Sequence, residues 1–120
     1  MCIRDSVKTV HNGIEYGIEQ ILAEAYDLMK RVKNMNGLQM SEVFGIWNNT
    51  DELASYLVEI TEICLNTKDE STEEYVVEKI LDKAGQKGTG LWTVVSALEL
   101  GVSVPTIYCL LYTSPSPRDS

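Results

Sequence analysis

The stretch VKTVHNGIEYGIEQILAEAYDLMKRVK, from Val7 to Lys33, decides the fold that the sequence predicts. Its apolar residues recur every three or four positions, at 7, 10, 14, 18, 21, 25, 28 and 32. This spacing places them on one side of an α-helix, which has 3.6 residues per turn. We therefore expect a long amphipathic helix whose apolar stripe needs partners elsewhere in the fold.

Further helices are expected along the rest of the chain. A break at Asn34 to Gly37 precedes a predicted helix over about 38–47, and Asn48-Asn49-Thr50 offers cap residues for another over about 51–65. Ser71 followed by Glu74 is compatible with a capping box and predicts a helix ending near residue 84. The residues expected on the buried sides of the first two are Val43, Phe44 and Trp47, then Leu53, Leu57, Ile60 and Cys64.

The last third of the chain completes an all-α prediction. LWTVVSALELG predicts a helix from Leu91 that ends at Gly101, because glycine is the usual residue at a helix C-terminus. Pro105 suits the first turn of a sixth helix. VSVPTIY is the one ambiguous segment with strand character. The predicted fold is therefore a multi-helix unit that begins with the long amphipathic helix.

Composition sets limits on the partners. The chain has 120 residues, enough for one domain with a modest core, and no apolar run approaches the roughly 20 residues that span a bilayer. Its 18 acidic and 10 basic side chains give a net charge of −8. Such a surface repels nucleic acid and anionic lipid, so we expect neither as a partner.

The two ends have a common origin. MCIRDS at the start and CLLYT in CLLYTSPSPRDS at the end back-translate to one DNA element in opposite orientations, which resembles a sequencing-library adapter. We therefore expect residues 1–6 and 109–120 to be adapter-derived and the sixth helix to be interrupted after Tyr108. Cys64 is then the only natural cysteine. It predicts a small buried apolar side chain and no metal or disulfide framework.

The segment KTVHNGIEYG, residues 8–17, places four polar side chains within an arc of roughly 100° on the helix: Lys8, His11, Asn12 and Glu15. Lys8 and Glu15 lie two turns, or roughly 10 Å, apart, too far for an i,i+4 ion pair. They can instead flank a ligand as base and acid. This would require burial or a nearby cation for Lys8, whose ordinary pKa is about 10.4, and desolvation for Glu15. A solvated helix face remains the alternative.

The segment GQKGTGLW, residues 85–92, also has two interpretations. It fits neither the GxGxxG of a dinucleotide site nor the GxxxxGK[ST] of a P-loop. The first interpretation is a helix stop and start, with Trp92 in the core. The second is an anion site made of Lys87, the Thr89 hydroxyl and backbone N–H groups at the helix start.

These segments together resemble the 6-phosphogluconate dehydrogenase family. LDKAGQKGTGLW, residues 81–92, resembles the signature of the family, and KTVHNGIEYG resembles its catalytic helix. VFGIWNNTDELASYLVEIT and LGVSVPTI are also similar and follow in the expected order, so the resemblance covers 7–108. It implies that this region is the first part of the all-helical C-terminal domain. The chain departs from the family at Gly17-Ile18-Glu19, where members commonly have Gly-Asp-Met.

The resemblance implies oxidative decarboxylation of 6-phosphogluconate to ribulose 5-phosphate and carbon dioxide, with NADP or in some members NAD, and without a metal. It also implies a cytoplasmic homodimer that acts in the pentose phosphate pathway. In this reaction Lys8 would be the general base and Glu15 the acid. Lys8 and Asn12 would lie near the nicotinamide. The residues that would contact substrate are His11 and Asn12, and those that would hold its phosphate are Tyr16, Lys87 and Thr89.

The Rossmann domain that binds the coenzyme in this family has no counterpart in the sequence, so we expect the 120 residues alone to be inactive. Two alternatives stay open. One is a β-hydroxyacid dehydrogenase relative, which the spacing of Lys8 and Asn12 also fits but which has no need of Lys87. The other is a non-catalytic acidic helical module.

Overall fold

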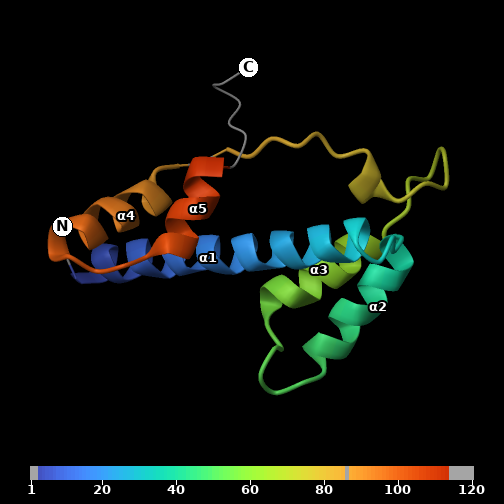
Figure 1. The fold of residues 1–120 in the computed structure, drawn as a ribbon, viewed down its shortest axis with the longest axis horizontal. Helices are drawn as coiled ribbons and strands as arrows, with labels where there is room; N and C mark the ends of the chain where they lie inside the picture. Colours follow the sequence, from blue (N-terminus) through green and yellow to red (C-terminus); the bar gives the residue numbers. More distant parts are fainter. Residues whose placement is uncertain (1–2, 86, 114–120) are drawn as a thin grey trace. The chain divides into compact units, whose positions relative to one another are not determined.

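The computed structural model describes residues 3–85 and 87–113, and over these residues it is all-helical, as predicted. The chain forms two compact units, Leu22–Leu81 and the residues on either side of that range, and the first helix contributes to both. The elements are drawn in Figure 1 and run in the order α1 Ile3–Arg31, α2 Gly37–Asn48, α3 Tyr56–Asn66, the short 3₁₀ helix η1 Val76–Glu78, α4 Thr89–Leu100 and α5 Pro105–Thr113.

Helix α1 confirms the long helix predicted from the apolar spacing. It begins at Ile3 and ends at Arg31, and Asn34 then takes a left-handed backbone conformation (φ 53°) at the predicted break. Lys30 and Arg31 lie in its last turn, where positive charge interacts favourably with the helix dipole.

The buried side of α1 is not the apolar stripe. Six residues of the stripe or its continuation are 50% to 71% exposed: Val7, Val10, Ile14, Ile21, Leu28 and Val32. The buried residues are Thr9, Gly13 and Gly17, which follow one another at intervals of four. Small side chains on this line let a neighbouring backbone approach closely, and this close packing decides which side is covered. The other two residues of the stripe, Ile18 and Ala25, are partly buried, and Ala25 packs against the core cluster of the unit Leu22–Leu81, so only a small part of the stripe is covered within the described residues.

Helices α2 and α3 pack against each other and form the core of the unit Leu22–Leu81. Phe44 and Met40 are fully buried, and Val58 and Leu65 complete the buried cluster. The ring of Trp47 lies edge-on to Phe44, with centroids 5.1 Å apart. The prediction for Phe44 is thus confirmed, whereas Val43 and Trp47 are only partly buried.

Helix α3 begins at Tyr56, five residues later than predicted. Ser55 is its N-cap, and its hydroxyl oxygen accepts a hydrogen bond from the Val58 N–H at 3.2 Å. Thr50 caps only an isolated turn: its hydroxyl oxygen accepts from the Leu53 N–H at 3.2 Å and its carbonyl accepts from the Ala54 N–H at 3.0 Å, but no helix continues from there. The predicted buried side is accordingly wrong at two positions. Leu53 lies before the helix and is exposed, as is Cys64.

The helix predicted from Thr72 to Ala84 is absent, and only η1 forms in that range. The reason is local. Both the N–H and the hydroxyl of Ser71 donate to the Asp69 carboxylate, at 2.9 and 2.8 Å, so Ser71 does not act as an N-cap. Glu73 then adopts a left-handed conformation (φ 57°), and the chain turns back so that Lys68 and Tyr75 form an isolated β-bridge.

Helix α5 also corrects a boundary. It starts at Pro105 as predicted but continues to Thr113, through residues 109–113 that were expected to interrupt it. Likewise α1 includes residues 3–6. Extending an existing helix adds one hydrogen bond for each residue that is ordered, so compatible flanking residues continue it readily.

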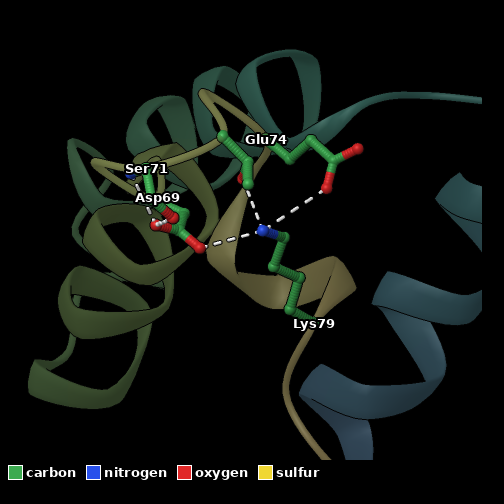
Figure 2. Close-up of polar contacts among 5 residues, drawn as sticks. Asp69, Ser71, Glu74 and Lys79 are labelled. Atoms are coloured by element: carbon green, nitrogen blue, oxygen red, sulfur yellow. Dashed lines mark hydrogen bonds and ion pairs between the residues drawn. The ribbon is translucent and has the colours of Figure 1, made fainter.

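Lys79 holds the turn that replaces the predicted helix (Figure 2). Its ammonium group lies 2.9 Å from the Asp69 carboxylate and 3.5 Å from that of Glu74, and it donates to the Thr72 hydroxyl. The hydrogen bonds from Lys79 and then from Ser71 hold the pKa of Asp69 far below its ordinary value. The bond to Asp69 in turn raises the pKa of Lys79.

This arrangement predicts a defined pH window. Asp69 contributes stability above the ordinary aspartate pKa of about 3.9, and this contribution is lost as the pH falls through the lowered value. Lys79 contributes below about pH 10.4 and loses its contribution as the pH rises through its raised pKa. In a carboxyl-carbon NMR titration of the chain, Lys79→Met should raise the midpoint of Asp69. Lys83→Met is the control and should not. An ordinary Asp69 midpoint in the unmodified chain would contradict the assignment.

Candidate functional site

The predicted site residues lie on α1 and around the start of α4, within one of the two units. Helix α4 begins at Thr89, two residues earlier than predicted, directly after Gly88 in a left-handed conformation (φ 101°). It ends before Gly101, which is also left-handed (φ 68°). The glycines at its two ends therefore permit backbone conformations that other residues rarely adopt.

Thr93 joins α4 to α1. Its hydroxyl is buried and lies 2.9 Å from each of two carbonyl oxygens, that of Thr9 on α1 and that of Thr89 one turn earlier on α4. Gly13 makes room for it, since a Cβ on Gly13 would lie 2.5 Å from the Thr93 hydroxyl oxygen. The contact therefore requires a residue without a side chain at position 13.

Tyr16 provides the second contact between the two helices. Its ring lies against the backbone of Gly90, where an added Cβ would be 2.3 Å from Cε2 of the ring. Tyr16 was predicted to share a phosphate site with Thr89, which directly precedes Gly90. The structure thus brings one predicted residue of α1 to the first turn of α4.

The other predicted residues of α1 lie along its more exposed side. Lys8 and His11 are exposed, whereas Asn12 and Glu15 are partly buried. The His11 ring lies between two neighbours, with Nδ1 3.1 Å from the Asn12 side-chain oxygen and Nε2 3.6 Å from the Glu15 carboxylate. Glu15 therefore has an i,i+4 partner that the sequence analysis did not assign, and a protonated His11 would form an ion pair with it.

Glu19 lies on α1 one turn after Glu15, on the same side of the helix. Partial burial of its carboxyl group raises its pKa, and the negative charge of Glu15 raises it further. The resemblance places aspartate at position 18 and methionine at position 19, so in this chain the acid near the predicted catalytic one lies one residue further along the helix.

The predicted anion-binding residues surround the start of α4. Lys87 is exposed and Thr89 is partly buried. Trp92 is 51% exposed, and its ring lies near Gly88, so it is not the core residue of the simpler interpretation. The N-cap residue Gly88 has no side chain that could accept a hydrogen bond from the first N–H groups of α4. These N–H groups are therefore open to other acceptors. Gln86 lies outside the described residues.

The described residues also show which metal groups and membrane spans they do not form. Among them, no three histidine, cysteine or acidic side chains form a group that could hold a metal ion. Nor does any described helix combine the length and the apolar character needed to cross a membrane.

The sequence analysis missed the residues that bring the two helices together. Gly13 and Gly90 have no polar side chain that would mark them as candidates, and the Thr93 hydroxyl lies within a predicted helix where nothing in the sequence indicates a partner. A signal was present in the sequence, because Thr9, Gly13 and Gly17 are small residues on one line of the long helix. This line predicts close approach of a second element, but it does not identify α4 as that element.

Substitution of Thr93 tests the junction. Thr93→Val keeps the shape but removes the hydroxyl that bonds two carbonyl groups, so the free energy of unfolding should fall by about 1–3 kcal/mol. Urea denaturation of the chain followed by circular dichroism measures this change. Ser96→Ala, an exposed change on the same helix, should stay within about 0.5 kcal/mol. Equal effects of the two changes would show that the Thr93 hydroxyl does not hold the helices together.

The fold and the site define an all-helical domain in which a polar helix face meets the glycine-flanked start of a second helix. The family model for the 6-phosphogluconate dehydrogenase C-terminal domain matches residues 5–113, and the chain belongs to this family. This match favours the family over the β-hydroxyacid dehydrogenase alternative.

Individual relatives agree with the family match. The chain is 57% identical over 102 residues to the decarboxylating 6-phosphogluconate dehydrogenase of Synechocystis sp., covering 85% of this chain and 21% of the relative. It is 54% identical over 101 residues to the NADP(+)-dependent, decarboxylating enzyme of Bacillus subtilis, covering 84% and 21%. The chain thus spans about a fifth of the length of these relatives.

A solved structure supports the fold. The Plasmodium falciparum 6-phosphogluconate dehydrogenase, described in its apo form and in complex with its cofactor NADP+ and its substrate 6-phosphogluconate, is 48% identical to this chain. The similarity has a TM-score of 0.84 and covers 88% of this chain and 22% of the other. The helical arrangement is therefore that of a known domain of this family.

Proposed function

We propose that this chain supplies the base, the acid and the phosphate-binding residues of a 6-phosphogluconate dehydrogenase. The reaction is the NADP-dependent (in some members NAD-dependent) oxidative decarboxylation of 6-phosphogluconate to ribulose 5-phosphate and carbon dioxide. The observation that carries the proposal is the contact of Tyr16 with Gly90, because it joins the two segments to which the resemblance assigns substrate. The printed names of the relatives support the same reaction and, in one case, the same coenzyme.

Lys8 acts first. A bound nicotinamide coenzyme, near Lys8 and Asn12, would supply the acceptor for the hydride that leaves carbon 3 of the substrate. Lys8 takes the proton of the carbon-3 hydroxyl in the same step, which leaves a keto group at carbon 3. Lys8 and Asn12 are one turn apart on α1, and Lys8 is exposed in this chain. The burial or nearby cation that a lysine base requires would therefore come with the bound substrate and coenzyme or from parts of the protein outside the described residues. Protonated Lys8 then stabilises negative charge on the keto oxygen while the carboxylate leaves as carbon dioxide, a step that needs no metal.

Glu15 acts last. It donates a proton to carbon 1 of the enediol, which yields ribulose 5-phosphate. His11 and Asn12 bind substrate between the base and the acid, and the contact of His11 with both Asn12 and Glu15 orients these side chains relative to one another. The separation of two helical turns suits a base and an acid that serve different carbons of one substrate.

The phosphate is held at the start of α4. Lys87 supplies a point charge, and Thr89 supplies a hydroxyl beside the first N–H groups of the helix. Tyr16 reaches the same turn from α1. The overall charge of −8 repels phosphate from most of the surface, so these local groups determine where it binds.

The remaining assignments follow from the resemblance. We propose that residues 7–108 are natural sequence and that 1–6 and 109–120 are adapter-derived. The longer protein to which the segment belongs would act as a cytoplasmic homodimer, with most of the coenzyme site on a domain outside these 120 residues.

Two substitutions in the full-length protein separate chemistry from phosphate binding. Lys8→Met should lower kcat by about 10²–10⁴-fold, because it removes the base, and should leave substrate affinity largely intact. Lys87→Ala should raise the KM for 6-phosphogluconate by about tenfold to a hundredfold, as expected for loss of one charge-assisted contact. Steady-state kinetics with NADP measures both changes.

Lys83→Ala is the matched control for Lys87, because it removes a nearby exposed lysine with no assigned role. It should change KM by less than about twofold. If neither Lys8→Met nor Lys87→Ala alters either parameter, the site assignment is wrong. Such a result would favour the non-catalytic helical module.

The 120-residue chain alone should not reduce NADP in the presence of 6-phosphogluconate. The described residues contain no sheet of the kind that binds a dinucleotide coenzyme, and the chain spans about a fifth of the relatives. Absorbance of NADPH at high protein concentration is the measurement, with a full-length relative as the positive control. Substrate-dependent NADPH formation by the purified chain would overturn this expectation.

A further inference from the structure

Glycines lie at both ends of α4 and within it. The physical reason for glycine at position 90 differs from the reason at positions 88 and 101. Gly88 and Gly101 have left-handed backbones, which glycine adopts most readily. Gly90 lies inside the first turn of α4, has no positive φ and is buried. Its backbone conformation would therefore accept alanine, and any requirement for glycine must come from the space around it.

That space is occupied by Tyr16. A Cβ at position 90 would lie 2.3, 2.5 and 2.9 Å from Cε2, Cδ2 and Cζ of the Tyr16 ring, whereas carbon atoms in contact are normally about 3.5–4.0 Å apart. These three atoms form one edge of a rigid ring close to its hydroxyl-bearing end. The ring must therefore move as a body, or the two helices must separate, before a methyl group can fit.

Separation of the helices is opposed by Thr93. Its hydroxyl donates to the Thr9 carbonyl and so ties α4 to α1 one turn away from Gly90, and at the same contact a Cβ on Gly13 would lie 2.5 Å from the Thr93 hydroxyl oxygen. With the helices held there, a Cβ at position 90 would act mainly on the Tyr16 ring.

We propose that Gly90 is a positioning residue, whose lack of a side chain places the Tyr16 ring against the first turn of α4, where it recognises the phosphate of the substrate. This inference rests on the proposed function and deepens it. Thr89 and Lys87 supply the polar groups of the subsite, and Gly90 determines how closely Tyr16 can join them.

A double-mutant cycle in the full-length protein tests the inference. Gly90→Ala should raise the KM for 6-phosphogluconate about tenfold, with a much smaller change in kcat, because the phosphate lies away from the reacting carbons. Tyr16→Ala should raise KM by a similar factor. Since Gly90 acts through Tyr16, adding Gly90→Ala to Tyr16→Ala should raise KM by less than about twofold further.

Gly85→Ala is the matched control, since nothing lies within 4 Å of a Cβ at that position, and it should leave KM unchanged. The inference is overturned if Gly90→Ala leaves KM unchanged, or raises it equally in the presence and absence of Tyr16. If Gly90→Ala does not fold alone, the double variant relieves the clash, and its KM must then match that of Tyr16→Ala.

Failure of this inference is distinguishable from failure of the proposed function. If the unmodified full-length protein neither turns over nor binds 6-phosphogluconate, both are wrong. If it turns over the substrate and Lys87→Ala raises KM, while the Gly90 and Tyr16 effects are additive, only the positioning role of Gly90 is wrong.

Discussion

The close packing of α1 on α4 is the constraint on which the candidate site depends. The Thr93 hydroxyl lies within hydrogen-bond distance of one carbonyl oxygen on each helix and shares its single proton between them, and glycines at positions 13 and 90 let the backbones and the Tyr16 ring come within contact distance. Side chains at these two glycines would enlarge the separation or displace the ring. Tyr16 would then no longer contact the first turn of α4, as the proposed phosphate site requires. Chemically inert residues thus decide where the reactive ones lie.

The sequence predicted most helices, and it failed where local hydrogen bonds competed with helix formation. Apolar spacing identified α1 and α2, and glycine and proline marked the ends of α4 and the start of α5. The pattern from Ser71 to Glu74 was compatible with a capping box, yet the side chain of Asp69 engages Ser71, and Lys79 secures the resulting turn. A capping motif indicates which hydrogen bonds a segment can form. It does not indicate which of two competing hydrogen bonds is stronger.

The polar residues of the candidate site could be proposed from the sequence, whereas its packing could not. The side-chain chemistry and spacing of Lys8, Glu15, Lys87 and Thr89 suggested their roles, and Tyr16 was added by the resemblance; these assignments stay predictions. The prediction that the apolar stripe of α1 is its buried side was largely wrong. Hydrophobic spacing indicates which side of a helix can be buried, but close backbone contact buries the side with Thr9, Gly13 and Gly17. Periodicity alone does not distinguish a face that attracts any apolar partner from a face shaped for one particular helix.

In the proposed function, one helix, α1, contacts both the reacting carbons and the phosphate of the substrate, and the order of its residues fits these two roles. The proposed base and acid follow each other along the helix, and Tyr16 comes directly after the acid, turned toward the start of α4. Under that proposal, a substrate anchored by its phosphate near Tyr16 would have its reacting carbons along the polar side of α1, past Glu15 and toward Lys8. Glu19 lies one turn beyond Glu15, and partial burial together with the negative charge of Glu15 raises its pKa. Because Ile18 and Glu19 stand where the resemblance places aspartate and methionine, the acid that follows Glu15 lies one residue further along the helix in this chain.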